Sequence, residues 1–191
     1  TMVDTESLWQ NWAMQGIERL DRYRRDGRVG FIGLSSHNVG VARMAVESGL
    51  IDVLMFPVNL YQHYGDQERA ALLETCAEHQ VGVVAMKPYY GGVLLQREGS
   101  PTGITPARCL HYVLSQPVAT TVPGPRDSDQ IRQALGYLTA PVEEKRSTTL
   151  HDELKHWLRG QCVQCKHCLP CPQDIPIPSV IYYLDYAEYY G

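Results

Sequence analysis

The sequence lacks an excess of basic residues, and it lacks any apolar run long enough to cross a membrane. Its 17 Lys and Arg residues are outnumbered by 21 Asp and Glu residues, which gives a net charge of −4 at pH 7. Because nucleic-acid binding needs a basic surface, we expect no nucleic-acid partner. A membrane-spanning helix needs about 20 mostly apolar residues, so we expect no membrane partner either.

No secretory signal peptide opens the sequence. Disulfides are rare in reducing compartments, and we predict a cytoplasmic location in which the six cysteines serve other purposes. Two of them, Cys76 and Cys109, fall inside predicted helices. We expect these two to be buried as small apolar residues.

Strand-like and helix-like patterns alternate four times over residues 1–140. Short apolar runs predict strands at 29–34, 51–56, 81–86 and 118–122, and the first of them is expected to be buried on both faces. Helical spacing and capping residues predict helices near 6–26, 39–48, 67–80, 106–116 and 128–138. This alternation is typical of parallel βαβ units. No GxGxxG motif follows the first strand, and the pattern fits half of a (β/α)8 barrel and a small open sheet equally well.

The pattern changes after Ala140, and we predict two units, 1–140 and 141–191. The second unit begins with a charged helix over 143–159. A cysteine-rich segment and a Pro-rich stretch follow, and a last helix is expected from Ser179. The second unit therefore reads as a small helical extension of the α/β unit.

The cysteine-rich segment, CVQCKHCLPCP, places four thiols three residues apart, at Cys162, Cys165, Cys168 and Cys171. A CxxCxxC run wraps three corners of an iron–sulfur cubane, and a cysteine followed by proline is the next element of ferredoxin sequences. Structural zinc normally uses two CxxC knuckles with a longer spacer between them. We therefore predict a 4Fe–4S site, with zinc as one alternative and free thiols or disulfides as the other. In two-cluster ferredoxins the Cys-Pro cysteine serves the other cluster, so Cys171 has two possible roles.

Polar and Gly-rich sequences follow each predicted strand, where parallel α/β folds carry their chemistry. They read SSHN, PVNLY, KPYYGG and PGPR in chain order. In the last of them Gly124 permits a close backbone approach, and Arg126 offers a forked donor just before a helix N-terminus. Lys87 adds a second positive charge. Together these loops predict a site for the phosphates of a nucleotide.

The segments GRVGFIGLSSHN, IDVLMFPVNLY, VGVVAMKPYYGG and HYVLSQPVATTVPGPRDSDQI resemble the fifth to eighth strands and following loops of aldo/keto reductases. CVQCKHCLPCPQDIPIP followed by YYLDYAEYYG resembles the tail of a bacterial subgroup that carries a ferredoxin-type segment. The resemblance implies an α/β fold, namely the second half (strands five to eight) of a (β/α)8 barrel with a small helical iron–sulfur tail. It also implies an oxidoreductase in which NADPH or NADH passes hydride to a small-molecule carbonyl substrate.

The resemblance assigns eight residues to the cofactor. Ser35 matches the serine that contacts the nicotinamide carboxamide. The loop along the pyrophosphate is matched by Lys87, Pro88 and Tyr89. The segment around the adenosine ribose and its 2′-phosphate is matched by Gly124, Arg126, Gln130 and Gln133, and the arginine would favour NADPH. Ser36, Met55 and Ala134 stand where the family usually has asparagine, glutamine and asparagine.

No residue of the sequence matches the family's catalytic Asp, Tyr, Lys and His, which come from the first four strands. We therefore expect the C-terminal half of a reductase, inactive alone. Half a barrel exposes strand edges, so we expect the missing N-terminal half or a second copy of the chain as partner. The alternative function is an iron–sulfur electron-transfer or structural module that binds no nucleotide.

Overall fold

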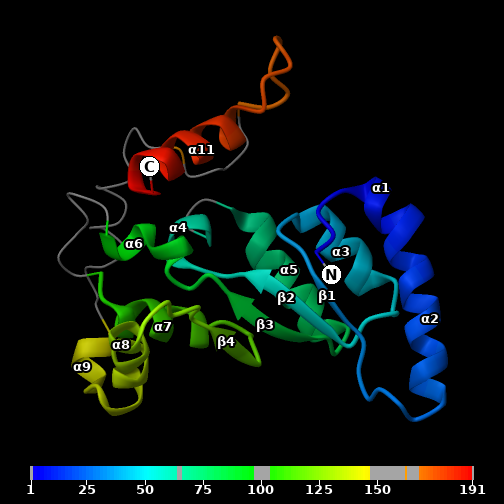
Figure 1. Ribbon diagram of the computed structural model, residues 1–191, viewed down its shortest axis with the longest axis horizontal. Helices are drawn as coiled ribbons and strands as arrows, with labels where there is room; N and C mark the ends of the chain where they lie inside the picture. Colours follow the sequence, from blue (N-terminus) through cyan, green and yellow to red (C-terminus); the bar gives the residue numbers. More distant parts are fainter. Residues whose placement is uncertain (1, 64–65, 97–103, 147–161, 163–167, 191) are drawn as a thin grey trace.

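The computed structural model describes residues 2–63, 66–96, 104–146, 162 and 168–190 (Figure 1). Four strands form its sheet, β1 (Gly33–Ser35), β2 (Val53–Pro57), β3 (Gly82–Met86) and β4 (Thr120–Val122). All pairs are parallel and the order is β1-β2-β3-β4. The predicted parallel βαβ units are therefore confirmed. A doubly wound sheet reverses its strand order at a switch point, whereas this sequential order is that of a barrel wall.

Helices fill the connections between the strands. The N-terminal helical segment consists of α1 (Glu6–Leu8), the π-helical η1 (Trp9–Ala13) and α2 (Met14–Arg25). The crossovers and the segment after β4 contain α3 (Val39–Glu47), α4 (Leu60–His63), α5 (Gln67–Glu78), the 3₁₀ turn η2 (Tyr90–Gly92), α6 (Val93–Gln96), α7 (Pro106–Leu114), α8 (Ser128–Thr139) and α9 (Val142–Lys145). The last helix is α11 (Ile177–Tyr190). Within these described residues no helix is long and apolar enough to cross a membrane.

Side-chain caps explain why several helix starts were predictable. The Thr105 hydroxyl accepts a hydrogen bond from the Arg108 amide, and Pro106 occupies the first turn of α7. Asn38, Asp66 and Asp127 cap α3, α5 and α8 in the same way. The predicted helix over 143–159 is described only at α9, because residues 147–161 lie outside the described part of the chain.

The first strand differs from its prediction. It begins at Gly33 rather than near residue 29, and Phe31 is 78% exposed rather than buried. The Asp52 carboxylate accepts the Ile32 amide at 2.8 Å, and pairing with β2 starts only after this contact. Gly33 is exposed as well, so the expectation that β1 is buried on both faces is wrong. An all-apolar run does not distinguish a central strand from one near an open edge.

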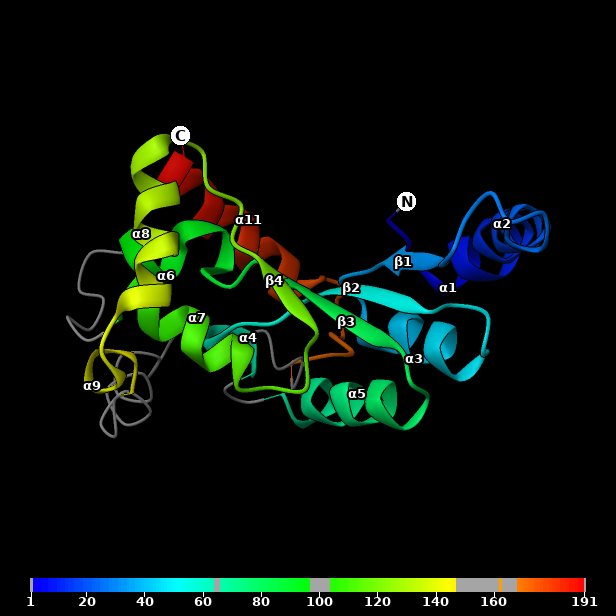
Figure 2. The same ribbon diagram turned by 90° about the horizontal axis from the view of Figure 1, so that it is seen from below.

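Helices α3 and α5 lie on the same side of the sheet (Figure 2). The core between them joins alternate strand residues to helix residues, including Leu54, Phe56, Val83, Ala85, Val41, Val46, Leu72 and Leu73. The intervening strand residues, Val53, Met55, Val84 and Met86, are only half-buried. The helices thus cover one face, as the outer helices of a barrel do, and the opposite face is partly open.

A second cluster lies at the carboxyl ends of β2 and β3. Its buried members are Leu60, Tyr61, Tyr90, Leu94, Ile104 and Cys109, and Tyr182 of α11 packs against it. In Figures 1 and 2, α11 lies beside α6 on this side of the molecule. The C-terminal helix therefore contacts the end of the sheet where the candidate site is found.

Candidate cofactor site

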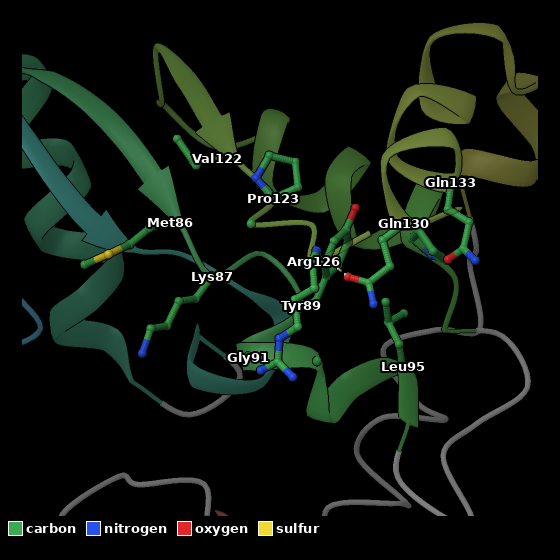
Figure 3. Close-up of a pocket in the computed structure, with 13 residues that line it drawn as sticks. Met86, Lys87, Tyr89, Gly91, Leu95, Val122, Pro123, Arg126, Gln130 and Gln133 are labelled. Carbon is green, nitrogen blue, oxygen red and sulfur yellow. Dashed lines mark hydrogen bonds between the residues drawn. The ribbon is translucent and has the colours of Figure 1, made fainter. Parts of the chain in front are cut away.

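A pocket of about 450 Å³ opens between the loops that follow β3 and β4 (Figure 3). Its volume is within the ordinary range for small-molecule sites. The described residues that line it are Met86, Lys87, Tyr89, Gly91, Gly92, Leu95, Pro106, Val122, Pro123, Gly124, Arg126, Gln130 and Gln133. Two of these are cations and none is a carboxylate, so the pocket is electrostatically suited to an anion.

The wall from the β3 loop has an unusual backbone. Lys87 and Tyr90 adopt φ angles of 55° and 52°, and Gly91 and Gly92 adopt 69° and 100°. Glycine takes up such angles without strain, whereas a residue with a Cβ does so at a cost that the surroundings must offset. The loop therefore turns sharply enough to present main chain and small residues to the pocket.

The Asn59 side chain fixes the start of this loop through hydrogen bonds. It is fully buried in the loop after β2, and its amide nitrogen donates to the Lys87 carbonyl at 3.2 Å and to the Gln62 Oε1 at 2.9 Å. Its Oδ1 accepts the Gln62 amide at 2.8 Å. The Lys87 carbonyl also accepts the Tyr90 amide at 2.9 Å. A single buried side chain thus fixes the position at which the β3 loop leaves the sheet.

The opposite wall comes from the β4 loop and the start of α8. Gly124 has a φ of 69°, in the region that favours glycine. The Arg126 amide donates to Gln130 Oε1 at 2.9 Å, and the Gln130 amide donates to the capping Asp127 carboxylate at 2.8 Å. Figure 3 shows the Arg126 side chain extending toward Gly91 of the other wall. A guanidinium group and a helix N-terminus therefore lie together at the opening of the pocket, an arrangement suited to phosphate.

Lys87 and Arg126 occupy different parts of the site. In Figure 3 the Lys87 ammonium points away from the Arg126 guanidinium. Two cations that diverge in this way do not grip one phosphate together. They are better placed to contact separate anionic groups of an extended ligand.

The Tyr89 hydroxyl is buried and has no hydrogen-bond partner in the described structure. Burial raises the pKa of Tyr89 to about 12, with a smaller contribution from Cys109. Burial also raises the pKa of the Cys109 thiol to about 12. Both groups therefore stay protonated at neutral pH, and the Tyr89 hydroxyl is a buried neutral group behind the pocket wall.

The pocket brings together six of the eight residues predicted to contact the cofactor: Lys87, Tyr89, Gly124, Arg126, Gln130 and Gln133. Pro88 belongs to the same loop but is buried beneath it and does not line the pocket. Ser35 ends β1, on the far side of β2 from the β3 loop. Sequence reasoning missed Leu95 and Pro106 as lining residues, because an apolar side chain in a helix carries no local sign of a ligand.

Among the predicted metal ligands, Cys162, Cys168 and Cys171 are free thiols, and Cys165 lies outside the described residues. No group of three His, Cys, Asp or Glu side chains in the described part of the chain is placed to share a metal ion. The free thiols are suitable donors for a cluster, but the four-cysteine ligand set stays a prediction. Cys76 and Cys109 are fully buried among apolar residues, as predicted.

A sequentially ordered parallel βα unit with an anion-suited pocket at the strand ends defines a (β/α)8-barrel type of protein. The sequence model of the aldo/keto reductase family matches residues 13–108, and the chain belongs to this family.

The fold is similar to that of the aldo-keto reductase AKR11C1 from Bacillus halodurans (holo form), with a TM-score of 0.59 and 18% identity. The match covers 81% of this chain and 57% of that chain, so the chain spans little more than half the length of this relative. No curated protein matches the sequence.

Proposed function

We propose that the chain forms the NADPH-binding half of an aldo/keto reductase barrel. The observation that carries the proposal is the pocket that Lys87, Gly124 and Arg126 help to line at the carboxyl ends of β3 and β4. It combines a guanidinium group, a helix N-terminus and a left-handed glycine, which together suit a phosphate group. Family membership supports this reading for the Lys87 loop, which lies within the matched residues 13–108. The roles of Gly124 and Arg126 are those that the sequence resemblance assigns.

Different residues would contact different parts of the cofactor. Arg126, Gln130 and Gln133 would hold the adenosine ribose and its 2′-phosphate. The loop from Lys87 to Gly92 would run along the pyrophosphate. Ser35 would orient the nicotinamide. Neighbouring strands are about 4.8 Å apart and β1 lies two strands from β3, so an extended dinucleotide that begins at the β3 loop can reach Ser35.

When bound, NADPH would supply the hydride for reduction of a small-molecule carbonyl to an alcohol. The contribution of these residues is to bind and orient the cofactor. The proton donor and its Asp, Lys and His partners would come from the other half of the barrel, because the resemblance matches none of them here. Reductase activity is therefore expected only when both halves are present.

Arg126→Ala should weaken NADPH binding by about 10- to 100-fold, the effect of losing a charge-assisted hydrogen bond to phosphate. NADH binding should change by less than about threefold, since NADH has no 2′-phosphate. Calorimetric titration of the chain measures both affinities directly, because Arg126 and the other described lining residues belong to this chain.

Arg132→Ala is the matched control, since Arg132 lies in α8, which begins two residues after Arg126, is exposed, pairs with Asp129 and does not line the pocket. It should leave both affinities unchanged. A wild-type chain that binds no NADPH, or an Arg126→Ala variant that binds it equally well, would contradict the proposed function and favour a module that binds no nucleotide.

We further propose that the partly open face of the sheet is covered by the other half of the barrel. Among the described residues, β4 pairs only with β3, and Val122 is 46% exposed. At the other edge, Met2 bridges Ser35 in parallel and the Val3 amide donates to the Ser35 carbonyl at 2.9 Å. Parallel pairing thus continues beyond β1, as it would in a closed barrel.

The chain without a complementary half should cover this face with a second copy of itself. Open strand edges and half-buried Val and Met side chains favour association in water. We expect sedimentation velocity to give twice the mass of one chain. A stable monomer would contradict the proposed partner surface.

The cysteine segment is proposed to bind a 4Fe–4S cluster through Cys162, Cys165, Cys168 and Cys171. The spacing of the thiols supports iron–sulfur over zinc. The packing of α11 against the carboxyl ends of β2 and β3 places the tail close to the proposed nucleotide site.

A further inference from the structure

We propose that the tail positions the nucleotide loop, so that loading the cysteine segment with its cluster tightens NADPH binding through Tyr61 and Tyr90. The inference rests on the proposed function, because it needs both a nucleotide and a cluster to bind. It adds a coupling between the two sites and names the side chains that transmit it.

The first contact joins the cysteine segment to the barrel. The Tyr61 hydroxyl, from α4, donates a hydrogen bond to the backbone carbonyl of Cys162. Tyr61 is only 1% exposed, so its ring is held by the surrounding core. A displacement of the backbone at Cys162 therefore acts on a buried side chain, which has little room to move.

The second contact links Tyr61 to the loop that lines the pocket. The rings of Tyr61 and Tyr90 stack with centroids 4.4 Å apart and an interplanar angle of 16°. Tyr90 lies between Tyr89 and Gly91, which both line the pocket. Its φ of 52° and the hydrogen bond from its amide to the Lys87 carbonyl make it the residue at which the loop turns. A shift of the Tyr61 ring must therefore move this turn or leave a gap in a packed cluster.

The third contact comes from the C-terminal helix. Tyr182 of α11 meets the Tyr90 ring edge-on, with centroids 6.4 Å apart and an interplanar angle of 71°. The tail thus reaches Tyr90 twice, through Cys162 and Tyr61 and through Tyr182. Such stacked and edge-on pairs contribute beyond the apolar area that they bury, so the arrangement has a preferred geometry.

A cluster bound to Cys162 would restrict the backbone that accepts the Tyr61 hydrogen bond. The nucleotide loop would then be held in one position before the cofactor arrives, and less ordering would be needed on binding. We expect NADPH to bind about five- to tenfold more tightly to the cluster-loaded chain, within the usual range of coupling between sites. Coupling is reciprocal, so NADPH should raise the affinity of the chain for the cluster by the same factor.

The experiment compares NADPH affinity by calorimetry for the wild-type chain with its cluster reconstituted anaerobically and for the iron-free chain. Tyr61→Phe keeps the stacked ring but removes the donor to Cys162. We expect this variant to fold normally and to bind NADPH equally in both states. Tyr183→Phe is the control, since Tyr183 is 68% exposed, and it should keep the five- to tenfold difference.

The outcomes separate the inference from the function on which it rests. Equal NADPH affinity in the loaded and iron-free wild-type chain would overturn the coupling and leave the nucleotide site standing. A Tyr61→Phe variant that keeps the full difference would overturn the assigned route. Failure of both wild-type forms to bind NADPH would overturn the proposed function and the inference with it.

Discussion

Replacing Arg69 with methionine should lower the free energy of unfolding by about 3–5 kcal/mol, the usual cost of removing one partner of a buried ion pair. Arg69 is 7% exposed, and its Nε donates to the Asp66 carboxylate at 3.0 Å. Its guanidinium also lies 5.1 Å from the centroid of the Phe56 ring and donates to the Pro57 carbonyl at 3.5 Å. Methionine keeps much of the packing but leaves the Asp66 carboxylate without its positively charged partner.

Burial lowers the pKa of the Arg69 guanidinium, and the charge of Asp66 opposes this effect. The pair is thus costly to bury and more costly to break. For a chain of this size each kcal/mol corresponds to about 2–4 °C in Tm. Thermal and urea unfolding of the variant, followed by circular dichroism, measure the loss.

Arg132→Met is the matched control for Arg69→Met. Arg132 also pairs with an aspartate three residues earlier on its chain, but both side chains of that pair are more than 70% exposed. Exposed pairs contribute at most about 1 kcal/mol. A loss below about 1 kcal/mol for Arg69→Met, similar to that of the control, would show that the buried pair does not stabilise the fold as argued.

The sequence predicted the fold best where local chemistry determines structure. Thr105 and Pro106 mark the start of α7, and the structure places the helix there. The Gly-rich loop after β3 and the PGPR loop after β4 were recognised by composition, and they form the two walls of the pocket. Caps, left-handed glycines and strand-end cations act over a few residues, so their sequence patterns are informative.

Features that depend on residues far apart in the chain were not predictable. Arg69 reads as a surface residue within QERAALLETCAE, and only the fold places its guanidinium against Phe56. Asn59 holds the carbonyl of Lys87, 28 residues away, and Tyr61 donates to Cys162 across 101 residues. Polar side chains that fix distant backbone give no periodic signal, although they decide where the nucleotide loop sits.

The serine substitution Cys168→Ser should remove nearly all of the cluster from the chain. Reconstituted wild-type chain is expected to bind about four iron atoms and to show the broad visible absorbance of a 4Fe–4S cluster. Loss of a residue that only supports a ligand lowers metal affinity about 10- to 100-fold. Loss of a ligand itself should lower it at least as much. Cys168 is exposed, so its replacement by serine should not disturb the core. Iron and zinc analysis of anaerobically prepared protein, together with its visible spectrum, measures the effect.

Two further cysteine variants make the result specific. Cys109→Ala is the control, because burial raises the pKa of this thiol to about 12 and keeps it from acting as a thiolate ligand. It should retain full iron content. Cys171→Ser distinguishes the two ligand sets, since it loses the cluster if all four cysteines bind it and retains it if Cys171 serves another. Wild-type protein that contains zinc alone, or a Cys168→Ser variant that keeps its iron, would exclude the proposed iron–sulfur site.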